Sequence, residues 1–136
     1  MGAIMRSAVA FGVDALVTTS RHSPGESGVL AKSASGALEH IELIEVRNLA
    51  EAIQTLNDSG FQTIGLDSAG ALQLEPAIKG DRIALVLGAE GKGLRQKTRE
   101  TVAVLARLDM PGAIHSLNVS NAAAVSLYIA TRHLSQ

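Results

Sequence analysis

The sequence predicts an α/β fold: one mostly parallel sheet with helices on both faces. Segments with helical spacing alternate with short apolar segments, as expected when helices connect parallel strands. Several of the strand candidates are uniformly apolar, which is typical of strands buried on both faces. The 136 residues are near the size of a single domain, and no repeat or change of composition marks a linker. We therefore expect one domain over residues 1–136.

In the first half of the chain, glycines end the helix candidates and short apolar runs mark the strands. Gly12 ends the first helix, Gly36 weakens the second, and Gly60 ends the third, which Asn48 and Glu51 precede as a cap-like pair. The expected elements are a helix (2–11), a strand (15–19), a loop (20–27), a weaker helix (29–40), a strand (41–46) and a helix from residue 48 to Gly60.

In the second half, residues 83–87 form a continuous apolar run that should be the central strand. The last helix has an apolar stripe and carries Arg132 and His133 near its negative end. The expected elements are a strand (61–66), a mostly loop segment (67–80), the central strand (83–87), a helix (94–102), a strand (104–108) and a long helix (119–134).

The composition excludes several classes of function. Twelve Lys and Arg stand against thirteen Asp and Glu, so any binding to nucleic acid must come from a local basic patch. One Tyr, two Phe and no Trp argue against a passive base-stacking module. The absence of Cys fits a reducing compartment, so the cytoplasm is the default expectation. No apolar run approaches the roughly 20 residues of a membrane span, and no targeting segment is evident.

A glycine-rich segment, GAEGKGL at residues 88–94, follows the central strand and precedes a helix. Open α/β sheets bind ligands at this position. Leu94 and Arg95 stand where a Walker loop requires Lys and Ser or Thr, and Gln96 stands where a dinucleotide fingerprint requires Gly or Ala. Glu90 is poorly placed for a phosphate but can accept hydrogen bonds from a ribose or a base. The alternative is a tight turn that binds nothing.

Four basic residues, Lys92, Arg95, Lys97 and Arg99, lie within eight positions at the start of the following helix. They would form a local patch for RNA, or simply a solvated helix face; charge alone does not separate the two.

The segment MPGAIHSLNVSN, residues 110–121, is too polar for a plain core. Ser116 and Asn118 are suited to cap the last helix, and together with Ser120 and Asn121 they also suggest a polar site. The histidines show no metal-ligand spacing, so we expect no metal. A hydrolase triad of Asp109, His115 and Ser116 lacks the nucleophile-elbow pattern.

Three segments together resemble the signature motifs of the SpoU/TrmH family of SPOUT methyltransferases. They are GAIMRSA followed by FG (2–8, 11–12), LVLGAEGKGL (85–94), and MPG with SLNVS (110–112, 116–120). Their order and spacing agree with the family over essentially the whole chain. The resemblance implies a deep trefoil knot in the carboxy-terminal half. It also implies methyl transfer from S-adenosylmethionine to a ribose 2′-hydroxyl of RNA.

The resemblance also assigns residues. Main-chain groups around Leu87, Gly88, Ala89, Leu108, Met110 and Leu117 would hold the donor. The catalytic residues would be Arg6, Glu90, Ser116 and Asn118. In the family the arginine helps to deprotonate the ribose hydroxyl, but a guanidinium is almost always charged. The alternative is that Arg6 orients a phosphate or stabilises the forming alkoxide.

The resemblance further implies a homodimer packed through the knot region, and a guanosine of large-subunit ribosomal RNA as target, with transfer RNA as the close competitor. No membrane partner is expected. In the family an asparagine and its supporting strand come just before the position of Gly2. This chain has Met1 in place of the asparagine, and the strand is absent, so we expect reduced stability and activity.

Two other functions compete with the enzyme. A non-catalytic, RNA-associated dimerisation module would bind RNA without the donor, and a generic nucleotide-binding domain would bind ATP but not S-adenosylmethionine.

Overall fold

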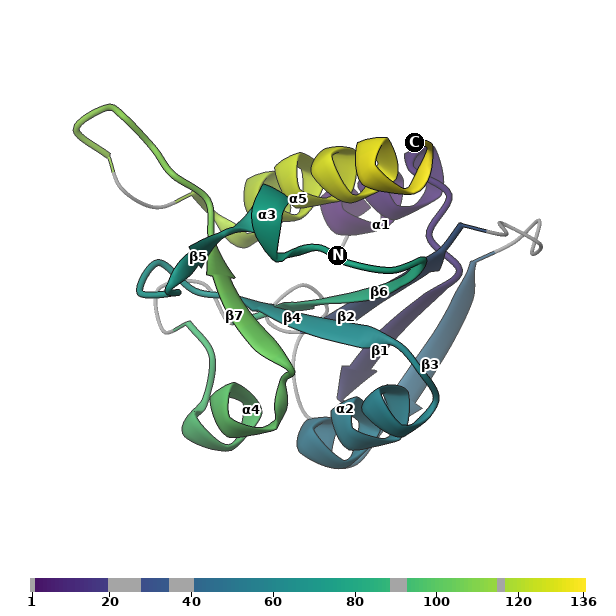
Figure 1. The fold of residues 1–136 in the computed structure, drawn as a ribbon. Coiled ribbons are helices and arrows are strands. Elements are labelled where there is room, and N and C mark those ends of the chain that lie inside the picture. The colour runs from purple at the N-terminus through teal and green to yellow at the C-terminus, as the bar shows by residue number, and fades with distance from the viewer. Residues whose placement is uncertain (1, 20–27, 35–40, 89–92, 115–116) are drawn as a thin grey trace.

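The computed structural model describes residues 2–19, 28–34, 41–88, 93–114 and 117–136, which form a seven-stranded sheet with helices on both faces (Figure 1). The strands are β1 (Ala15–Thr19), β2 (Gly28–Ser33), β3 (Glu42–Val46), β4 (Gln62–Leu66), β5 (Leu72–Gln73), β6 (Arg82–Leu87) and β7 (Val104–Arg107). The helices are α1 (Gly2–Ala10), α2 (Leu49–Asp58), α3 (Leu74–Ala77), α4 (Gln96–Thr101) and α5 (Val119–Leu134). The predicted α/β class is confirmed.

The strand order is β3-β1-β2-β6-β4-β7-β5. The strand pairs β1–β3, β4–β6, β4–β7 and β5–β7 are parallel, whereas β2 is antiparallel to both of its neighbours. β6 is the middle strand of the seven described, and all of its residues after Arg82 are buried. The prediction that residues 83–87 form the central strand is confirmed.

The prediction of a helix over residues 29–40 is wrong, because its first part is strand β2. Leu30 pairs with Leu16 of β1 on one side and with Leu85 of β6 on the other. The first four residues of β2 are all buried, as expected of a strand covered on both faces. A short apolar run fits a buried strand and a helix equally well, so periodicity alone did not separate them.

The prediction that residues 67–80 are mostly loop is also incomplete, because this segment contains β5 and α3. Leu74 and Ala77 of α3 are buried against the sheet. Elements of two and four residues are too short to show a period in the sequence. The other helices and strands begin and end within two residues of the prediction. Residues 20–27 of the predicted loop and residues 35–40 lie outside the described residues.

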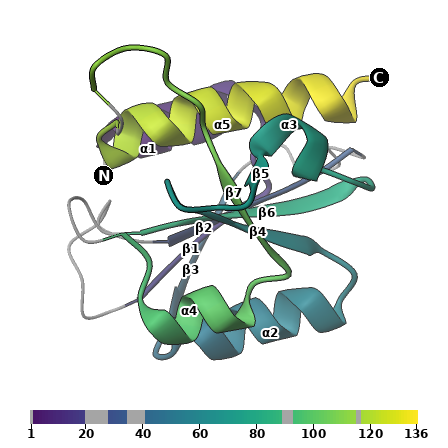
Figure 2. The same ribbon diagram turned by 60° about the vertical axis from the view of Figure 1, so that its left-hand side comes forward.

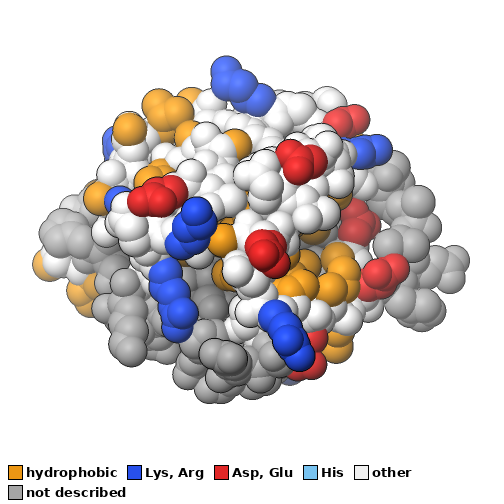
Figure 3. All heavy atoms as spheres, turned by 90° about the horizontal axis from the view of Figure 1, so that it is seen from below, with side chains coloured by type: hydrophobic (Ala, Val, Ile, Leu, Met, Phe, Trp, Pro, Cys, Tyr) orange, Lys and Arg blue, Asp and Glu red, His pale blue; other side chains and the backbone are white. Residues whose placement is uncertain are grey.

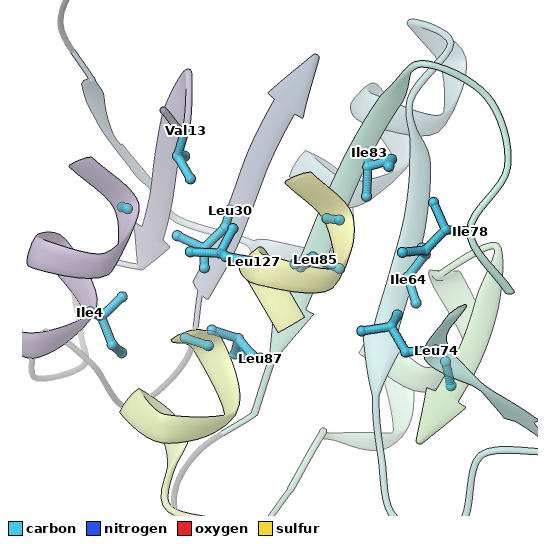
Figure 4. Packing of buried hydrophobic residues seen from close by; sticks show 14 of the residues in the cluster. Ile4, Val13, Leu30, Ile64, Leu74, Ile78, Ile83, Leu85, Leu87 and Leu127 are labelled. Carbon is cyan, nitrogen blue, oxygen red and sulfur yellow. The ribbon is translucent and has the colours of Figure 1, made fainter. Parts of the chain in front are cut away.

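The two faces of the sheet carry separate cores. α1, α3 and α5 lie on one face, and α2 and α4 on the other (Figure 2). Along β2 and β6, Leu30 and Leu85 point to the first face, while Val29 and Val86 belong to the second core. Figure 4 shows the first core, in which Leu127 of α5 lies among the strand side chains. Within the described residues, no helix has the length and apolar character to cross a membrane.

Candidate functional site

The carboxyl ends of β4, β6 and β7 meet at one edge of the sheet, because the three strands are parallel neighbours. This is the edge at which open α/β sheets bind ligands. Leu87 and Gly88 lie at the end of β6, and Leu108 and Met110 follow β7. Leu87 is buried and the other three are half-buried. Four of the predicted donor-binding residues are therefore brought to one edge.

The glycine-rich segment is tightly pinched at its base. A Cβ atom on Gly88 would lie 2.3 Å from the carbonyl carbon and 2.4 Å from the carbonyl oxygen of Gly93. Gly93 has a φ of +69°, a conformation that favours glycine. Both glycines are thus required by the backbone path. Ala89 and Glu90, predicted to bind donor and substrate, lie outside the described residues.

Asn118 caps α5, as the capping interpretation predicts. Its Oδ1 accepts hydrogen bonds from the backbone N–H of Asn121 at 2.9 Å and from Oγ of Ser120 at 2.8 Å. The amide Nδ2 of Asn118 has no hydrogen-bond partner among the described residues, and the side chain is exposed. Asn118 therefore has a donor to offer while it holds the helix. Ser116 lies outside the described residues.

Arg6 projects from the exposed side of α1. Ile4 and Ala8 of the same helix are buried, and α1 lies beside α5 in both ribbon views (Figures 1 and 2). Arg6 makes no hydrogen bond or ion pair with another described residue, so its guanidinium is available to a ligand. Arg6 and Asn118 thus lie on neighbouring helices, although no contact joins them. Leu117, predicted to contact the donor, is 41% exposed.

Sequence reasoning missed the pairing of charged side chains at the same edge. Asp67, directly after β4, forms an ion pair with Arg99 of α4, and its side chain is 12% exposed. Asp109, beside Met110, accepts hydrogen bonds from Nε of Arg107 at 2.7 Å and Nε2 of Gln73 at 2.6 Å. The only available signal was the sequence Asp-Ser-Ala-Gly after a strand, which is typical of an Asx turn.

This ion pair lowers the net positive charge of the predicted basic patch, because the charge of Arg99 is paired with that of Asp67. Lys97 is exposed on α4. Figure 3 views the molecule from the side of α2 and α4, where basic and acidic side chains are intermingled. The described part of this face resembles a solvated surface more than a basic patch. Lys92 lies outside the described residues. Elsewhere in the described ranges, no group of three or more His, Asp or Glu could hold a metal ion.

Residues 1–128 match the SpoU rRNA Methylase family. The chain belongs to this family. The family predicted from the three motifs is therefore confirmed.

Relatives within the SpoU family include the 23S rRNA (guanosine-2′-O-)-methyltransferase RlmB of Xylella fastidiosa. It is 41% identical over 97% of this chain and 53% of its own length. RlmB of Ralstonia nicotianae is 41% identical over 99% of this chain and 54% of its own length. The chain thus spans about half the length of these curated relatives.

Solved structures of SpoU methyltransferases share the fold. The enzyme AviRb from Streptomyces viridochromogenes, in complex with the cofactor AdoMet, superposes with a TM-score of 0.76 at 24% identity, covering 97% of this chain and 52% of its own. The TrmH/SpoU tRNA-modifying enzyme of A. aeolicus gives a TM-score of 0.75 at 23% identity, covering 96% of this chain and 66% of its own. The predicted knot stays a prediction.

Proposed function

We propose that this chain transfers a methyl group from S-adenosylmethionine to the ribose 2′-hydroxyl of a guanosine in large-subunit ribosomal RNA. The observation that carries the proposal is 41% identity over 97% of the chain to an enzyme named for this reaction. The edge formed by β4, β6 and β7 supports it, since four of the predicted donor-binding residues lie there: Leu87, Gly88, Leu108 and Met110.

The residues at this edge fit such a donor. S-adenosylmethionine carries a positive sulfonium and no phosphate, and the glycine-rich segment lacks the residues of both phosphate-binding patterns. Main-chain groups and apolar side chains of Leu87, Gly88, Ala89, Leu108, Met110 and Leu117 would hold it. When bound, the donor supplies an electrophilic methyl group.

The chain's own polar residues would orient the RNA. Arg6 has an exposed guanidinium, which suits it to hold a phosphate or to stabilise the alkoxide of the ribose oxygen. The free amide of Asn118 can donate a hydrogen bond to the substrate. Glu90 and Ser116 would complete the site.

The proposed enzyme is a cytoplasmic homodimer packed through a knotted carboxy-terminal region. Val9 of α1 is 61% exposed, and Val125 and Tyr128 of α5 are 43% and 54% exposed. Tyr128 also meets the ring of Phe11 edge-on, with ring centroids 6.3 Å apart. Exposed apolar side chains on two adjacent helices are typical of a protein interface.

The test is transfer of a labelled methyl group to ribosomal and transfer RNA that lack modification. We expect label in large-subunit RNA, no label with Arg6→Ala, and partial activity with Arg6→Lys if charge alone is needed. RNA binding without transfer would favour the dimerisation module, and label in transfer RNA alone would correct the substrate.

A further inference from the structure

Three chain segments meet at the candidate donor site: those after β4 and β7 and the one that leads into α4. Asp67 lies in the first and is connected to the other two. Its Oδ2 accepts a hydrogen bond from Nη1 of Arg99 on α4. Its Oδ1 accepts the backbone N–H of Ala69 at 2.8 Å, and its own N–H donates to the carbonyl oxygen of Ala106 on β7 at 2.9 Å. The Asp67 carboxylate thus forms hydrogen bonds within its own loop and to α4, while the Asp67 backbone N–H connects the same loop to β7.

On the α4 side, this connection reaches the base of the glycine-rich segment. Leu94 leads from that segment into α4, and its Cδ1 would lie 2.8 Å from a Cβ atom on Gly65 of β4. Gly65 and Asp67 both face the side of the sheet on which α4 lies, since Gly65 approaches Leu94 and Asp67 pairs with Arg99. The Leu94 contact and the Arg99 ion pair hold one end of the glycine-rich segment against β4.

On the β7 side, the connection reaches Met110. The Asp67 loop ends at Gly70, where a Cβ atom would lie 2.7 Å from the backbone of Ala106. The carbonyl oxygen of Gly70 accepts a hydrogen bond from Nη1 of Arg107 at 2.9 Å. Nε of Arg107 in turn donates to Asp109, the neighbour of Met110. A continuous polar chain therefore runs from Arg99 to Asp109.

We propose that Asp67 is a positioning residue for the methyl donor, acting through this chain of contacts to hold the segments after β4 and β7 and the start of α4 around one site. This inference rests on the proposed function. Asp67 joins loops whose residues are far apart in sequence, since Arg99 lies 32 positions away. Loops that are already ordered lose less conformational entropy when the ligand binds. Loosening them therefore lowers the affinity for the ligand without removing any contact to it.

The experiment is calorimetric titration with S-adenosylhomocysteine of the wild type, Asp67→Asn, Arg99→Gln and the double variant. Asp67→Asn keeps an acceptor for Ala69 but loses the charge that pairs with Arg99. Asp58→Ala is the matched control, because among the described residues its exposed carboxylate accepts a hydrogen bond only from Gln54 within α2. We expect about tenfold weaker binding for each single variant and no further loss in the double variant.

Two further measurements separate positioning from simple destabilisation. Hydrogen exchange should become faster in the segments after β4 and β7 and at the start of α4, while α5 stays protected. In the methyl-transfer assay, the KM for S-adenosylmethionine should rise with little change in the KM for RNA.

The outcomes are distinct. A wild type that does not bind the ligand overturns the proposed function and this inference with it. A wild type that binds, with variants that bind equally well, overturns the inference alone. Single-variant losses that simply add in the double variant also overturn it, because the two side chains would then act independently.

Discussion

The backbone of Gly88 lies so close to that of Gly93 that a Cβ atom on Gly88 would come within 2.3 Å of the Gly93 carbonyl carbon. Real Cβ atoms do not approach backbone this closely. The end of β6 and the backbone at Gly93 can therefore lie in contact only because residue 88 is glycine. The geometry of the candidate donor site therefore depends in part on this contact.

Gly88→Ala is expected to displace the glycine-rich segment. Crowding of this kind costs about 1–3 kcal/mol in the free energy of unfolding, which chemical denaturation measures. Gly112→Ala is the matched stability control, since a Cβ atom there meets nothing within 4 Å, and we expect a change of less than about 0.5 kcal/mol. Equal midpoints for the wild type and Gly88→Ala would show that the pinch is not present in solution.

Asn118→Ala removes the cap of α5 and should cost about 1 kcal/mol of stability. Asn48→Ala is the comparison, because Oδ1 of Asn48 accepts the N–H of Glu51 at 3.1 Å and caps α2 in the same way. If Asn118 also serves the reaction, methyl transfer should fall far more in Asn118→Ala than in Asn48→Ala at equal loss of stability. Equal activities would leave Asn118 a cap only.

Val125→Glu should convert the proposed homodimer to monomer, because it introduces a charge into an apolar face of α5. Leu43→Glu is the matched control: Leu43 is 62% exposed on the edge strand β3, away from α5. Sedimentation should give a dimer for the wild type and Leu43→Glu. A Val125→Glu variant that remains dimeric would exclude this face as the interface.

Leu30→Ala tests whether β2 is a buried interior strand. Leu30 is fully buried between β1 and β6, so its truncation should cost about 2–5 kcal/mol by denaturant unfolding. Leu43→Ala, on the exposed edge strand, should cost less than about 0.5 kcal/mol. Equal, small losses in both variants would contradict the strand assignment.

How much the sequence predicts depends on the range of the interactions involved. α5 was predicted with the observed bounds because its apolar stripe, the Asn118 cap and the basic residues of its last turn all lie within the segment. β6 was predicted as central because a uniformly apolar strand requires cover on both faces.

Features set by distant partners were not predicted. β2 is a strand because it forms backbone hydrogen bonds with β1 on one side and β6 on the other, and the sequence of residues 28–33 alone does not indicate these partners. The pair of Asp67 and Arg99 joins positions 32 apart, so neither residue alone suggested a link between two loops. The donor and catalytic roles came from resemblance of three motifs, not from periodicity or charge.

The proposed reaction requires the chain to bind the methyl donor, and S-adenosylhomocysteine tests this binding without any RNA. We would titrate the wild-type protein with it by calorimetry and titrate ATP as the competing nucleotide. We predict saturable binding of S-adenosylhomocysteine at one site per chain, lost or strongly weakened in Gly88→Ala, and no binding of ATP. A folded wild-type protein that binds ATP, or that gives no heat with S-adenosylhomocysteine, would contradict this prediction.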